Sequence, residues 1–459
     1  MGEFIKYKGF ELAFSWGGWS VKYLVAFYLC LPLLAYFILP FFTAKRTLSG
    51  NRKSIAIIVL GDLGHSPRMC YHSLSFSKLN YYVSLCGYLQ SEPSDEILED
   101  VNIDIKAIPM VENHGLPFLL FAIEKICMQV VSLFSLLFEL RGIDYIMIQN
   151  PPSMPLLLIS IIFVKLFSRN TKIIIDWHNL NYSILNLKYN NENHPLVRFL
   201  KLYEMILGRF AFYNLTVTKR MKRFLVSDFG MNSKKISTLH DRPASSFKPL
   251  QELETTKMDI LNSHPLFQDI TGVDKYKILV SSTSFTPDED FNILLDALKY
   301  YDSSEKNEPL LLIVTGKGPL KQAFRERVKD LRFLKKVIVK TAWLSVEDYP
   351  VVLAIADLGV SLHTSSSGID LPMKIVDFFG CGIPVISLDF PAIDELVKHD
   401  YNGVVVTGKD QAKVICQHLE HLFRDQEKLN RLKNGAIEES HTRWNENWNR
   451  VMKPRFEFD

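Results

Sequence analysis

The chain has 459 residues, 47% of them apolar and 22% charged, which is too apolar for a disordered protein and sufficient for two large α/β domains. Its 53 basic and 50 acidic residues give a net charge of +3, which argues against a protein that binds nucleic acid by neutralising phosphates. The 6 cysteines show no CxxC pair or regular spacing, so neither a disulfide framework nor a metal site is predicted.

The first feature along the chain is an uncharged apolar run at residues 23–42. A helix rises about 1.5 Å per residue, so this run spans about 30 Å, the thickness of the hydrocarbon core of a bilayer. Trp16 and Trp19 precede the run, as expected for aromatic side chains at a membrane interface. A cleaved signal peptide fits less well, because no basic segment opens the chain and no small-residue cleavage site follows the run.

Residues 1–50 are therefore expected to be a single-pass membrane anchor with a transmembrane helix. Basic residues follow the span at 45–53 without an acidic residue among them, whereas the lysines before it are partly offset by Glu3 and Glu11. This small bias places the C-terminal bulk of the chain in the cytosol.

From residue 54 onward, short β-branched runs alternate with amphipathic stretches, which is typical of parallel strands joined by crossover helices. The expected strands of a first series lie at residues 54–60, 82–87, 145–149 and 172–176. Those of a second series lie at residues 277–281, 310–315, 337–339, 358–362 and 384–387. Two such series predict an α/β protein with two Rossmann-like doubly wound domains that face a cleft.

The domain boundaries follow from the places where this alternation stops. Residues 54–245 are expected to form the first domain and residues 277–435 the second. Residues 246–276 lack the alternation and are expected to connect the two domains, and residues 436–459 are expected to form a helical tail.

Two segments of the first domain are unusually apolar, at residues 116–140 and 155–164. The second is too short to span a bilayer, and the first carries charges near its middle. Both can be buried helices of a large domain. Alternatively, they lie against the bilayer beside the anchor, because Phe and Leu occupy more than one helical face.

The most informative segment is residues 363–386, HTSSSGIDLPMKIVDFFGCGIPVI. A hydroxyl-rich loop follows an expected strand there, and Pro372 suits the first turn of a helix. Loop hydroxyls and free N–H groups at a helix N-terminus bind anions, and Lys374 adds a positive charge. Asp377 lies on the same helix face and can accept hydrogen bonds from two ribose hydroxyls. The segment predicts a nucleotide-diphosphate pocket, and a helix that merely caps well is the alternative.

Three further segments carry weaker signals. Gly316 and Gly318 permit close approach of the backbone to a ligand, and Lys317 between them supplies charge. The acidic triplet at residues 288–290 opens a helix after a proline, where acidic side chains complement the helix dipole, so it is not predicted to bind a metal. Arg242, at the exit of the first domain, can bind a phosphate in bidentate fashion.

Polar side chains also follow two strands of the first domain. Asp62, His65 and Arg68 come after the first expected strand, and Asp176 and His178 come at the end of the strand at 172–176. Because the carboxyl ends of parallel strands meet at one edge of a sheet, these side chains are expected to project into the cleft. These side chains can take part in catalysis, or they can have a purely structural role, and the sequence leaves both alternatives open.

These motifs resemble a known family. The pattern P-x-K-x-x-[ED]…G-x-P-V is similar to the donor-binding signature of two-domain GT-B glycosyltransferases. More narrowly, seven strings resemble, in order, the chitobiosyldiphosphodolichol β-mannosyltransferases of the endoplasmic reticulum in their fungal form, from residue 54 to about 448. The strings are GDLGHSPRMCYH (61–72), QNPPSMP (149–155), DWHNLNYS (176–183), DRPAS (241–245), TSFTPDEDF (283–291), TGKGPLK (315–321) and HTSSSGIDLPMK (363–374).

The resemblance implies an inverting enzyme that transfers mannose from GDP-mannose to GlcNAc2-diphosphodolichol. The β-1,4 linkage formed is the first mannosylation of the lipid-linked oligosaccharide for N-glycosylation. It also implies a protein of the endoplasmic reticulum membrane with a cytosolic catalytic domain. Association with other early mannosyltransferases is expected, and a nucleic-acid partner is not. No cofactor is expected to be required, and a divalent metal is expected to be at most stimulatory. Two alternatives are a lipid-linked-sugar GT-B transferase that uses a UDP-sugar and a catalytically dead GT-B membrane scaffold.

The resemblance also implies site residues by motif position. The donor-binding residues are Asp377 at the ribose, and Lys374, Ser366, Ser367, Gly368, Lys317, Gly318 and Arg242 around the diphosphate. The acceptor-binding residues are Arg68, His65 and Tyr182. The loop STSFTPDED departs from the broader GT-B pattern because it lacks the Arg and Lys that many relatives carry. The cationic role therefore falls to Lys317, Lys374 or Arg242.

An inverting displacement needs a general base, and His178, Asp62 and Asp176 qualify. Because the departing GDP is held by the second domain, the base is expected on the first domain. Asp176 follows a buried strand and can orient His178, a common way to fix the tautomer of an imidazole. His178 is therefore the first candidate, and Asp62 is its main rival.

Overall fold

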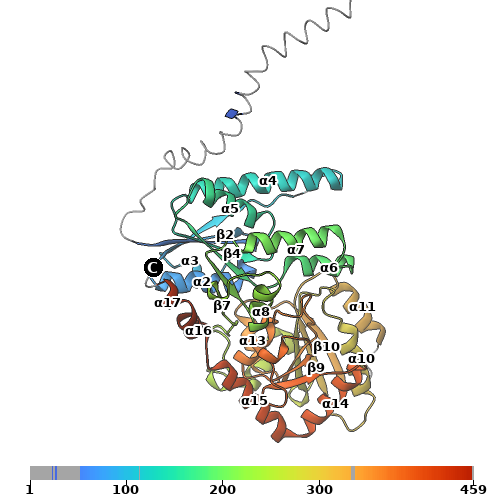
Figure 1. Ribbon diagram of the computed structural model, residues 1–459. Helices are drawn as coiled ribbons and strands as arrows, with labels where there is room; N and C mark the ends of the chain where they lie inside the picture. Colours follow the sequence, from blue (N-terminus) through green and yellow to red (C-terminus); the bar gives the residue numbers. More distant parts are fainter. Residues whose placement is uncertain (1–22, 24–25, 28–51, 113, 332–335, 457–459) are drawn as a thin grey trace, which may run out of the picture. The chain divides into compact units, whose positions relative to one another are not determined.

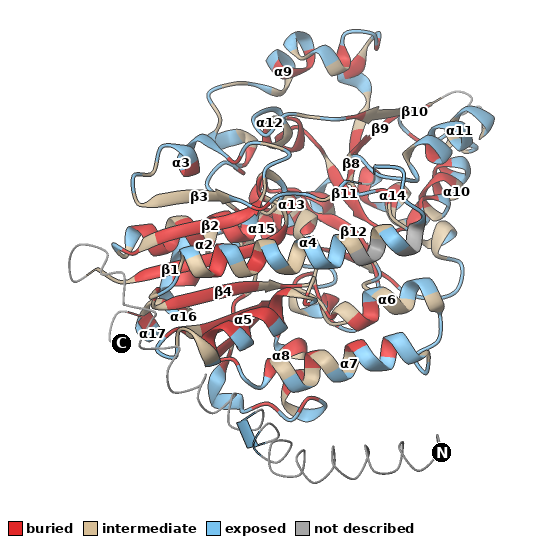
Figure 2. Ribbon diagram, turned by 90° about the horizontal axis from the view of Figure 1, so that it is seen from above, coloured by how far each residue is buried: buried red, intermediate tan, exposed pale blue. Residues whose placement is uncertain are grey.

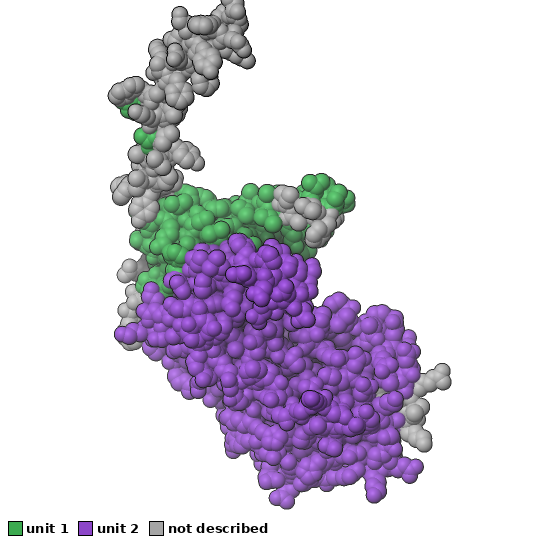
Figure 3. Space-filling model, turned by 45° about the vertical axis from the view of Figure 1, so that its right-hand side comes forward, with its two compact units in different colours: residues 1–175, 210–212 green, residues 176–209, 213–459 purple. Residues whose placement is uncertain are grey.

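The computed structural model describes Tyr23, Ala26, Phe27 and residues 52–456 apart from 113 and 332–335 (Figure 1). Nearly all of the expected span at residues 23–42 lies outside these described residues. Among them, no helix combines the length and the apolar character needed to cross a bilayer. The chain divides into two compact units, Met1–Ile175 with Phe210–Phe212, and Asp176–Arg209 with Tyr213–Asp459 (Figure 3).

The first sheet has seven strands in the order β3-β2-β1-β4-β5-β6-β7. At its centre, β1 pairs in parallel with β2 and β4, and Ile57 lies opposite Leu85 and Met147. The residues of β1 are apolar and buried over most of its length, as a central strand covered on both faces requires. The strands are β1 (Ser54–Asp62), β2 (Tyr82–Tyr88), β3 (Ile103–Ala107), β4 (Tyr145–Asn150), β5 (Lys172–Trp177), β6 (Tyr213–Thr216) and β7 (Ile236–Thr238).

The second sheet has six strands in the order β10-β9-β8-β11-β12-β13, and each neighbouring pair is parallel. Side chains of β8 alternate between two apolar cores, with Ile278 and Val280 on one side and Leu279 on the other. The sheet is therefore covered on both faces. Its strands are β8 (Lys277–Ser282), β9 (Leu310–Thr315), β10 (Val337–Ala342), β11 (Leu358–Ser361), β12 (Val385–Leu388) and β13 (Gly403–Val406).

Helices connect the strands and follow them. Those between strands of the first sheet are α2 (Pro67–Lys78), α3 (Asp95–Leu98), α4 (Phe118–Glu139), α5 (Leu156–Leu166), α6 (Asn181–Tyr189), α7 (Pro195–Gly208) and α8 (Lys219–Ser227). The later helices are α9 (Lys257–Ser263), α10 (Phe291–Asp302), α11 (Lys321–Leu331), α12 (Asp348–Ala354), α13 (Met373–Gly380), α14 (Gln411–Arg424), α15 (Gln426–Ser440), α16 (Trp444–Val451) and α17 (Lys453–Phe456).

Each strand expected from the sequence is present, and β3, β6, β7 and β13 were not expected. The segment at 246–276, expected as a connection, contains α9 and packs Ile260 and Phe267 into the same core as Ile278. The expected tail begins inside α15. In α16, which follows α15, the Asn447 amide donates a hydrogen bond of 2.8 Å to the carbonyl oxygen of His240, just after β7. The tail therefore packs against the end of the first sheet.

The two apolar segments of the first domain differ in burial. Helix α5 is a core helix in which Phe163 is fully buried. Helix α4 buries Leu133 and Leu137 but exposes apolar side chains along its other turns, as Figure 2 shows by colour. The exposed ones are Leu120, Ile126, Met128 and Val131, at 50–64% of their accessible surface.

Candidate functional site

The strand order of the second sheet reverses between β8 and β11, which are hydrogen-bonded neighbours. Ligands of doubly wound proteins bind outside the carboxyl ends of the strands at such a reversal. Two loops leave the sheet there. One follows β8 and ends at Asp290, the N-cap of α10. The Asp290 side chain accepts a hydrogen bond from the Asn292 N–H. The other is residues 362–372 after β11, and we call it the donor loop.

The backbone of the donor loop is shaped for a tight turn. Ser365 and Gly368 have positive φ angles of 57° and 71°. The Ser365 hydroxyl accepts a hydrogen bond of 2.8 Å from the Gly368 N–H and donates one to the Asp370 carboxylate. Pro372 is the N-cap of α13, which begins at Met373. The loop, its hydroxyls and the helix start therefore lie where the sequence predicted an anion site.

Residues that follow β5 and β6 hold the donor loop. The Asn179 amide donates hydrogen bonds of 3.2 Å to the Ser366 hydroxyl and to the Asp370 carboxylate. The Ser183 hydroxyl lies 3.1 Å from that of Ser366, and Thr218 donates to the carbonyl oxygen of Ile369. These contacts lie within one compact unit. Ser366 is thus positioned by the segment that also carries Asp176 and His178.

The His178 ring lies beside the Asp176 carboxylate at the end of β5. The Nε2 atom of His178 is 2.9 Å from Oδ2 of Asp176. The Asp176 side chain is fully buried, whereas that of His178 is 23% exposed. The structure therefore has the carboxylate behind the imidazole, as the sequence suggested.

Lys374 and Asp377 both lie on α13, and each side chain interacts with other polar residues. The Lys374 ammonium forms an ion pair with the buried Glu289 carboxylate from the loop after β8. Burial and the Asp241 carboxylate raise the pKa of Asp377 to about 8, although a hydrogen bond from the Tyr349 hydroxyl opposes this shift. A carboxyl group with this pKa is largely protonated at neutral pH.

The glycines at 316 and 318 lie where two loops of the second sheet approach closely. A Cβ atom at Gly316 would overlap the carbonyl oxygen of Thr283, and one at Gly318 would overlap that of Ser284. The glycines therefore permit two loops of the second sheet to pack together. Lys317 is exposed, and its ammonium lies 3.8 Å from the centroid of the Trp343 ring.

Arg242 is turned toward α15. Its guanidinium donates to the Glu439 carboxylate at 2.9 Å and to the Glu439 carbonyl oxygen at 3.1 Å. Both bonds use Nη1, whereas the Nε–H group is buried without a hydrogen-bond partner among the residues that the structure describes.

In the first unit, Asp62 accepts hydrogen bonds from the backbone N–H groups of Gln90 and Ser91 and from the Ser91 hydroxyl, and lies 2.7 Å from His65 Nδ1. Partial burial opposes ionisation, but these hydrogen bonds outweigh it and lower the pKa of Asp62 to about 2. A carboxylate so fully engaged is a weak proton acceptor at neutral pH. Its contacts fit a role in holding the loop after β1.

The residues expected to bind the acceptor divide into one exposed and two buried side chains. His65 is exposed, and its Nδ1 lies 2.8 Å from the Ser91 hydroxyl. Arg68 is 1% exposed in α2, and Tyr182 is 9% exposed beneath Lys201 and near Phe229. Acceptor contact by Arg68 and Tyr182 stays a prediction, and their burial means that such contact would require these side chains to become accessible.

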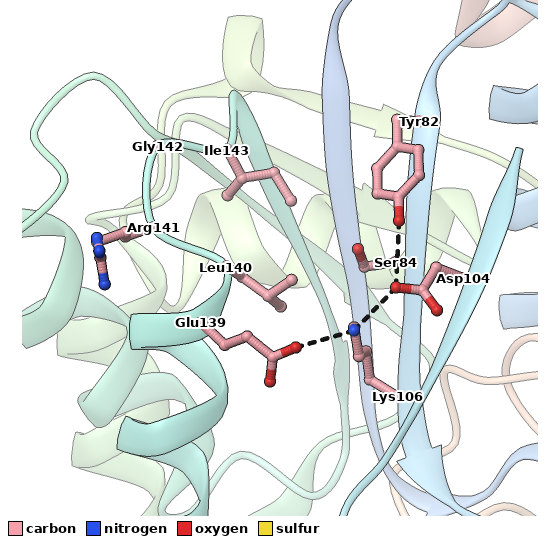
Figure 4. A pocket seen from close by; sticks show the side chains of 9 residues that line it. All are labelled: Tyr82, Ser84, Asp104, Lys106, Glu139, Leu140, Arg141, Gly142 and Ile143. Carbon is pink, nitrogen blue, oxygen red and sulfur yellow. Dashed lines mark hydrogen bonds and ion pairs between the residues drawn. The ribbon is translucent and has the colours of Figure 1, made fainter. Parts of the chain in front are cut away.

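A polar pocket lies in the first unit, near the start of β2 and β3 (Figure 4). Lys106 bridges Asp104 and Glu139 at 2.9 and 2.8 Å, and the Tyr82 hydroxyl donates to Asp104 at 3.1 Å. None of the residues that line this pocket belongs to the donor loop or to the loop after β8.

Sequence reasoning missed three residues of the site: His363, Asn179 and Tyr349. The ring nitrogens of His363 face Asp288 and Asp370, and the Tyr349 hydroxyl oxygen lies 2.8 Å from that of Ser282. His363 and Asn179 stand inside the strings HTSSSG and DWHN, so their positions next to strand ends were a usable signal. Tyr349, within α12, offered none.

The chain is similar to known proteins over most of its length. The family model described as "Glycosyl transferases group 1" matches residues 265–439. A chitobiosyldiphosphodolichol β-mannosyltransferase from Candida albicans is 59% identical over 459 residues, covering 100% of this chain and 99% of its own. One from Debaryomyces hansenii is 58% identical, with 99% and 98% covered, and one from Mus musculus is 36% identical, with 88% and 89% covered.

Solved structures are similar at lower identity. Sucrose-phosphate synthase from Thermosynechococcus elongatus has a TM-score of 0.66 at 13% identity, covering 89% of this chain and 98% of its own. A glycosyltransferase from Rickettsia africae has a TM-score of 0.61 at 16% identity, with 87% and 96% covered. These structures support the GT-B fold of two Rossmann-like domains.

Proposed function

Because the chain belongs to the family of chitobiosyldiphosphodolichol β-mannosyltransferases and is a glycosyltransferase, we propose that it transfers mannose from GDP-mannose to the outer GlcNAc of GlcNAc2-diphosphodolichol. The full-length identity of 58–59% to relatives with this name is the observation that carries the proposal. The names supply the acceptor and the β linkage. The choice of GDP-mannose as donor belongs to the proposal.

An α-linked donor that yields a β-linked product requires one inverting displacement. The acceptor hydroxyl oxygen attacks the anomeric carbon of mannose while the bond to the diphosphate breaks, and GDP leaves with the electron pair. The hydroxyl proton passes to a base. The site must therefore supply a proton acceptor and stabilise the negative charge of the departing diphosphate.

We assign the base to His178. With Nε2 beside the buried Asp176 carboxylate, Nδ1 is the nitrogen with a free lone pair in the neutral ring. Asp176 also stabilises the imidazolium that forms when the proton arrives. Asp62 is the weaker candidate, because its pKa of about 2 leaves little basicity.

We assign the nucleotide and diphosphate to the switch point of the second sheet. Asp377 is proposed to bind the ribose. Lys374 pairs with Glu289, so a bound diphosphate would compete with Glu289 for its charge. Arg242 pairs with Glu439 through Nη1 alone and keeps its Nε–H to donate. The other proposed donor-binding residues are Ser366, Ser367, Gly368, Lys317 and Gly318.

The acceptor lipid requires the site to work at a membrane. We propose that residues 23–42 anchor the chain in the endoplasmic reticulum membrane with the catalytic units in the cytosol, where other early mannosyltransferases of the lipid-linked oligosaccharide act. The exposed apolar turns of α4 support contact with lipid, because a helix that lies in a membrane interface buries such side chains.

A direct donor test distinguishes the proposal from its alternatives. Purified full-length protein is given GlcNAc2-diphospholipid with labelled GDP-mannose or labelled UDP-GlcNAc. Transfer of mannose alone is expected. Transfer of GlcNAc would indicate a UDP-sugar transferase, and transfer of neither would indicate an inactive scaffold.

A further inference from the structure

His363 is the second residue of the donor loop, which directly follows β11. Its backbone forms an isolated antiparallel bridge with Glu289, in the loop after β8. Its side chain is 15% exposed, and its ring lies edge-on to Phe390, with 5.8 Å between the centroids. The ring is therefore fixed between the two loops that leave the sheet at the switch point.

Two carboxylates face opposite sides of this ring. Nδ1 of His363 lies 3.5 Å from Oδ2 of Asp288, and Nε2 lies 3.4 Å from Oδ2 of Asp370. Nε2 is buried without a hydrogen-bond partner in the described part of the chain, so the two contacts are ion pairs at these distances. Only the protonated ring carries the positive charge that attracts both carboxylates. Burial opposes protonation, and so does the nearby Lys374, but Asp288 and Asp370 outweigh both and raise the pKa of His363 to about 9.

Asp370 in turn fixes the strained turn of the donor loop. Its carboxylate accepts hydrogen bonds from Ser365, which has a positive φ angle, and from Asn179. A non-glycine residue keeps such a φ only when its surroundings hold it. The charge on His363 therefore stabilises the carboxylate on which the turn depends.

The net charge around the donor loop also depends on the proton of His363. Three carboxylates, Asp288, Glu289 and Asp370, meet two cations, Lys374 and protonated His363, which leaves a net charge of −1. Loss of the His363 proton would make it −2, beside the place assigned to a negatively charged diphosphate. Repulsion would then weaken donor binding.

We infer that His363 is a positioning residue for the donor, whose positive charge ties the loop after β8 to the donor loop and holds the donor loop in its diphosphate-binding conformation. The inference rests on the proposed function, because it takes a nucleotide sugar as the ligand of this loop. His363 itself need not touch the donor.

Steady-state kinetics of the full-length protein with GDP-mannose and GlcNAc2-diphospholipid from about pH 6.5 to 10 test the inference. In the wild type, kcat/KM for the donor should fall near pH 9 through a rise in KM. In His363→Gln, KM for the donor should be about tenfold higher at neutral pH, with kcat within about twofold and no fall near pH 9. His421→Gln, on an exposed position of α14, should match the wild type.

Asp288→Asn provides a second, independent variant. Removing one of the two carboxylates lowers the pKa of His363, so the alkaline fall should move to lower pH. A wild-type donor KM in a folded His363→Gln, or an unmoved fall in Asp288→Asn, would overturn the inference. If the wild type transfers no mannose, the proposed function fails. The role of His363 is then decided by calorimetry, which measures GDP binding to the same variants at neutral and alkaline pH.

Discussion

The Nε2 atom of His178 lies 2.9 Å from Oδ2 of Asp176, at the carboxyl end of β5. Asp176 is fully buried and His178 is 23% exposed, so the carboxylate can act on an acceptor only through the ring in front of it. The pair therefore presents one basic nitrogen, Nδ1, to whatever binds there. This relationship makes the assignment of the base testable.

His178→Ala is expected to lower kcat by about 10²–10⁴-fold at saturating donor and acceptor, because it removes the proton acceptor. GDP affinity, measured by calorimetry, should change little, since the ring is assigned to the acceptor. His421→Ala is the matched control, and its kcat should stay at the wild-type value.

Asp62→Asn separates the two candidate bases. Asp62 is assigned to holding the loop after β1, so this variant should retain most of the wild-type kcat while its thermal stability falls. Near-normal kcat in His178→Ala together with a collapse in Asp62→Asn would transfer the role of base to Asp62.

Asp377→Ala is expected to weaken GDP binding with the fold intact, because loss of two ribose hydrogen bonds costs on the order of 2–4 kcal/mol. Calorimetric titration with GDP measures the change, and circular dichroism checks the fold. Unchanged affinity would remove Asp377 from the site.

The raised pKa of Asp377 also predicts a dependence of stability on pH. An ordinary Asp pKa is 3.8 and that of folded Asp377 is about 8, so the folded chain binds this proton more tightly. The resulting stabilisation is complete below about pH 4 and is lost as the pH rises through about 8. Asp377→Asn lacks this loss, so its Tm relative to the wild type should increase between about pH 5 and 9. Parallel Tm curves would show that Asp377 is ionised throughout.

Two glycosylation sequons test the proposed topology, at Asn181 and Asn214. Both should remain bare in intact membranes if the units face the cytosol. Asn214 is 3% exposed and accepts a hydrogen bond from the Trp177 indole, so its folded state has no room for a glycan. Asn181 is the informative site. A glycosidase-sensitive mass shift that disappears in Asn181→Gln would overturn the orientation.

Deletion of residues 1–44 should leave activity on a short-chain acceptor and partial binding to liposomes, because the exposed apolar turns of α4 would remain. Replacing Ile126 and Val131 by Ser in the truncated chain should reduce that binding. Val101→Ser, at an exposed apolar position outside α4, is the control. A freely soluble and fully active truncation would argue against contact between α4 and lipid.

Most of the fold could be predicted from the sequence because buried parallel strands are continuous apolar runs. The strands that were missed are short or mixed in polarity: β7 is Ile-Ser-Thr, and β3 alternates Ile103, Asp104 and Ile105. The segment at 246–276 was expected to connect the two domains, and its buried residues were not predicted. Its apolar residues lie in short helices whose burial depends on β8, which is distant in sequence.

The candidate site was predicted in outline, since its loops follow strand ends and carry polar residues. Its pairings were not predictable, because Lys374 with Glu289 and Arg242 with Glu439 join residues far apart in sequence. For the same reason, the close contact of Gly316 and Gly318 with the backbone of Thr283 and Ser284 could not be predicted from the sequence.

A single inverting displacement from GDP-mannose leaves a β-mannosyl bond in the product. Nuclear magnetic resonance of the product made from GDP-mannose and GlcNAc2-diphospholipid reads this configuration directly, because the one-bond coupling between C1 and H1 of mannose differs between the two anomers. A β-linked mannose on the 4-position of the outer GlcNAc is the predicted result. An α-linked mannose, or a mannose on another position, would contradict the account.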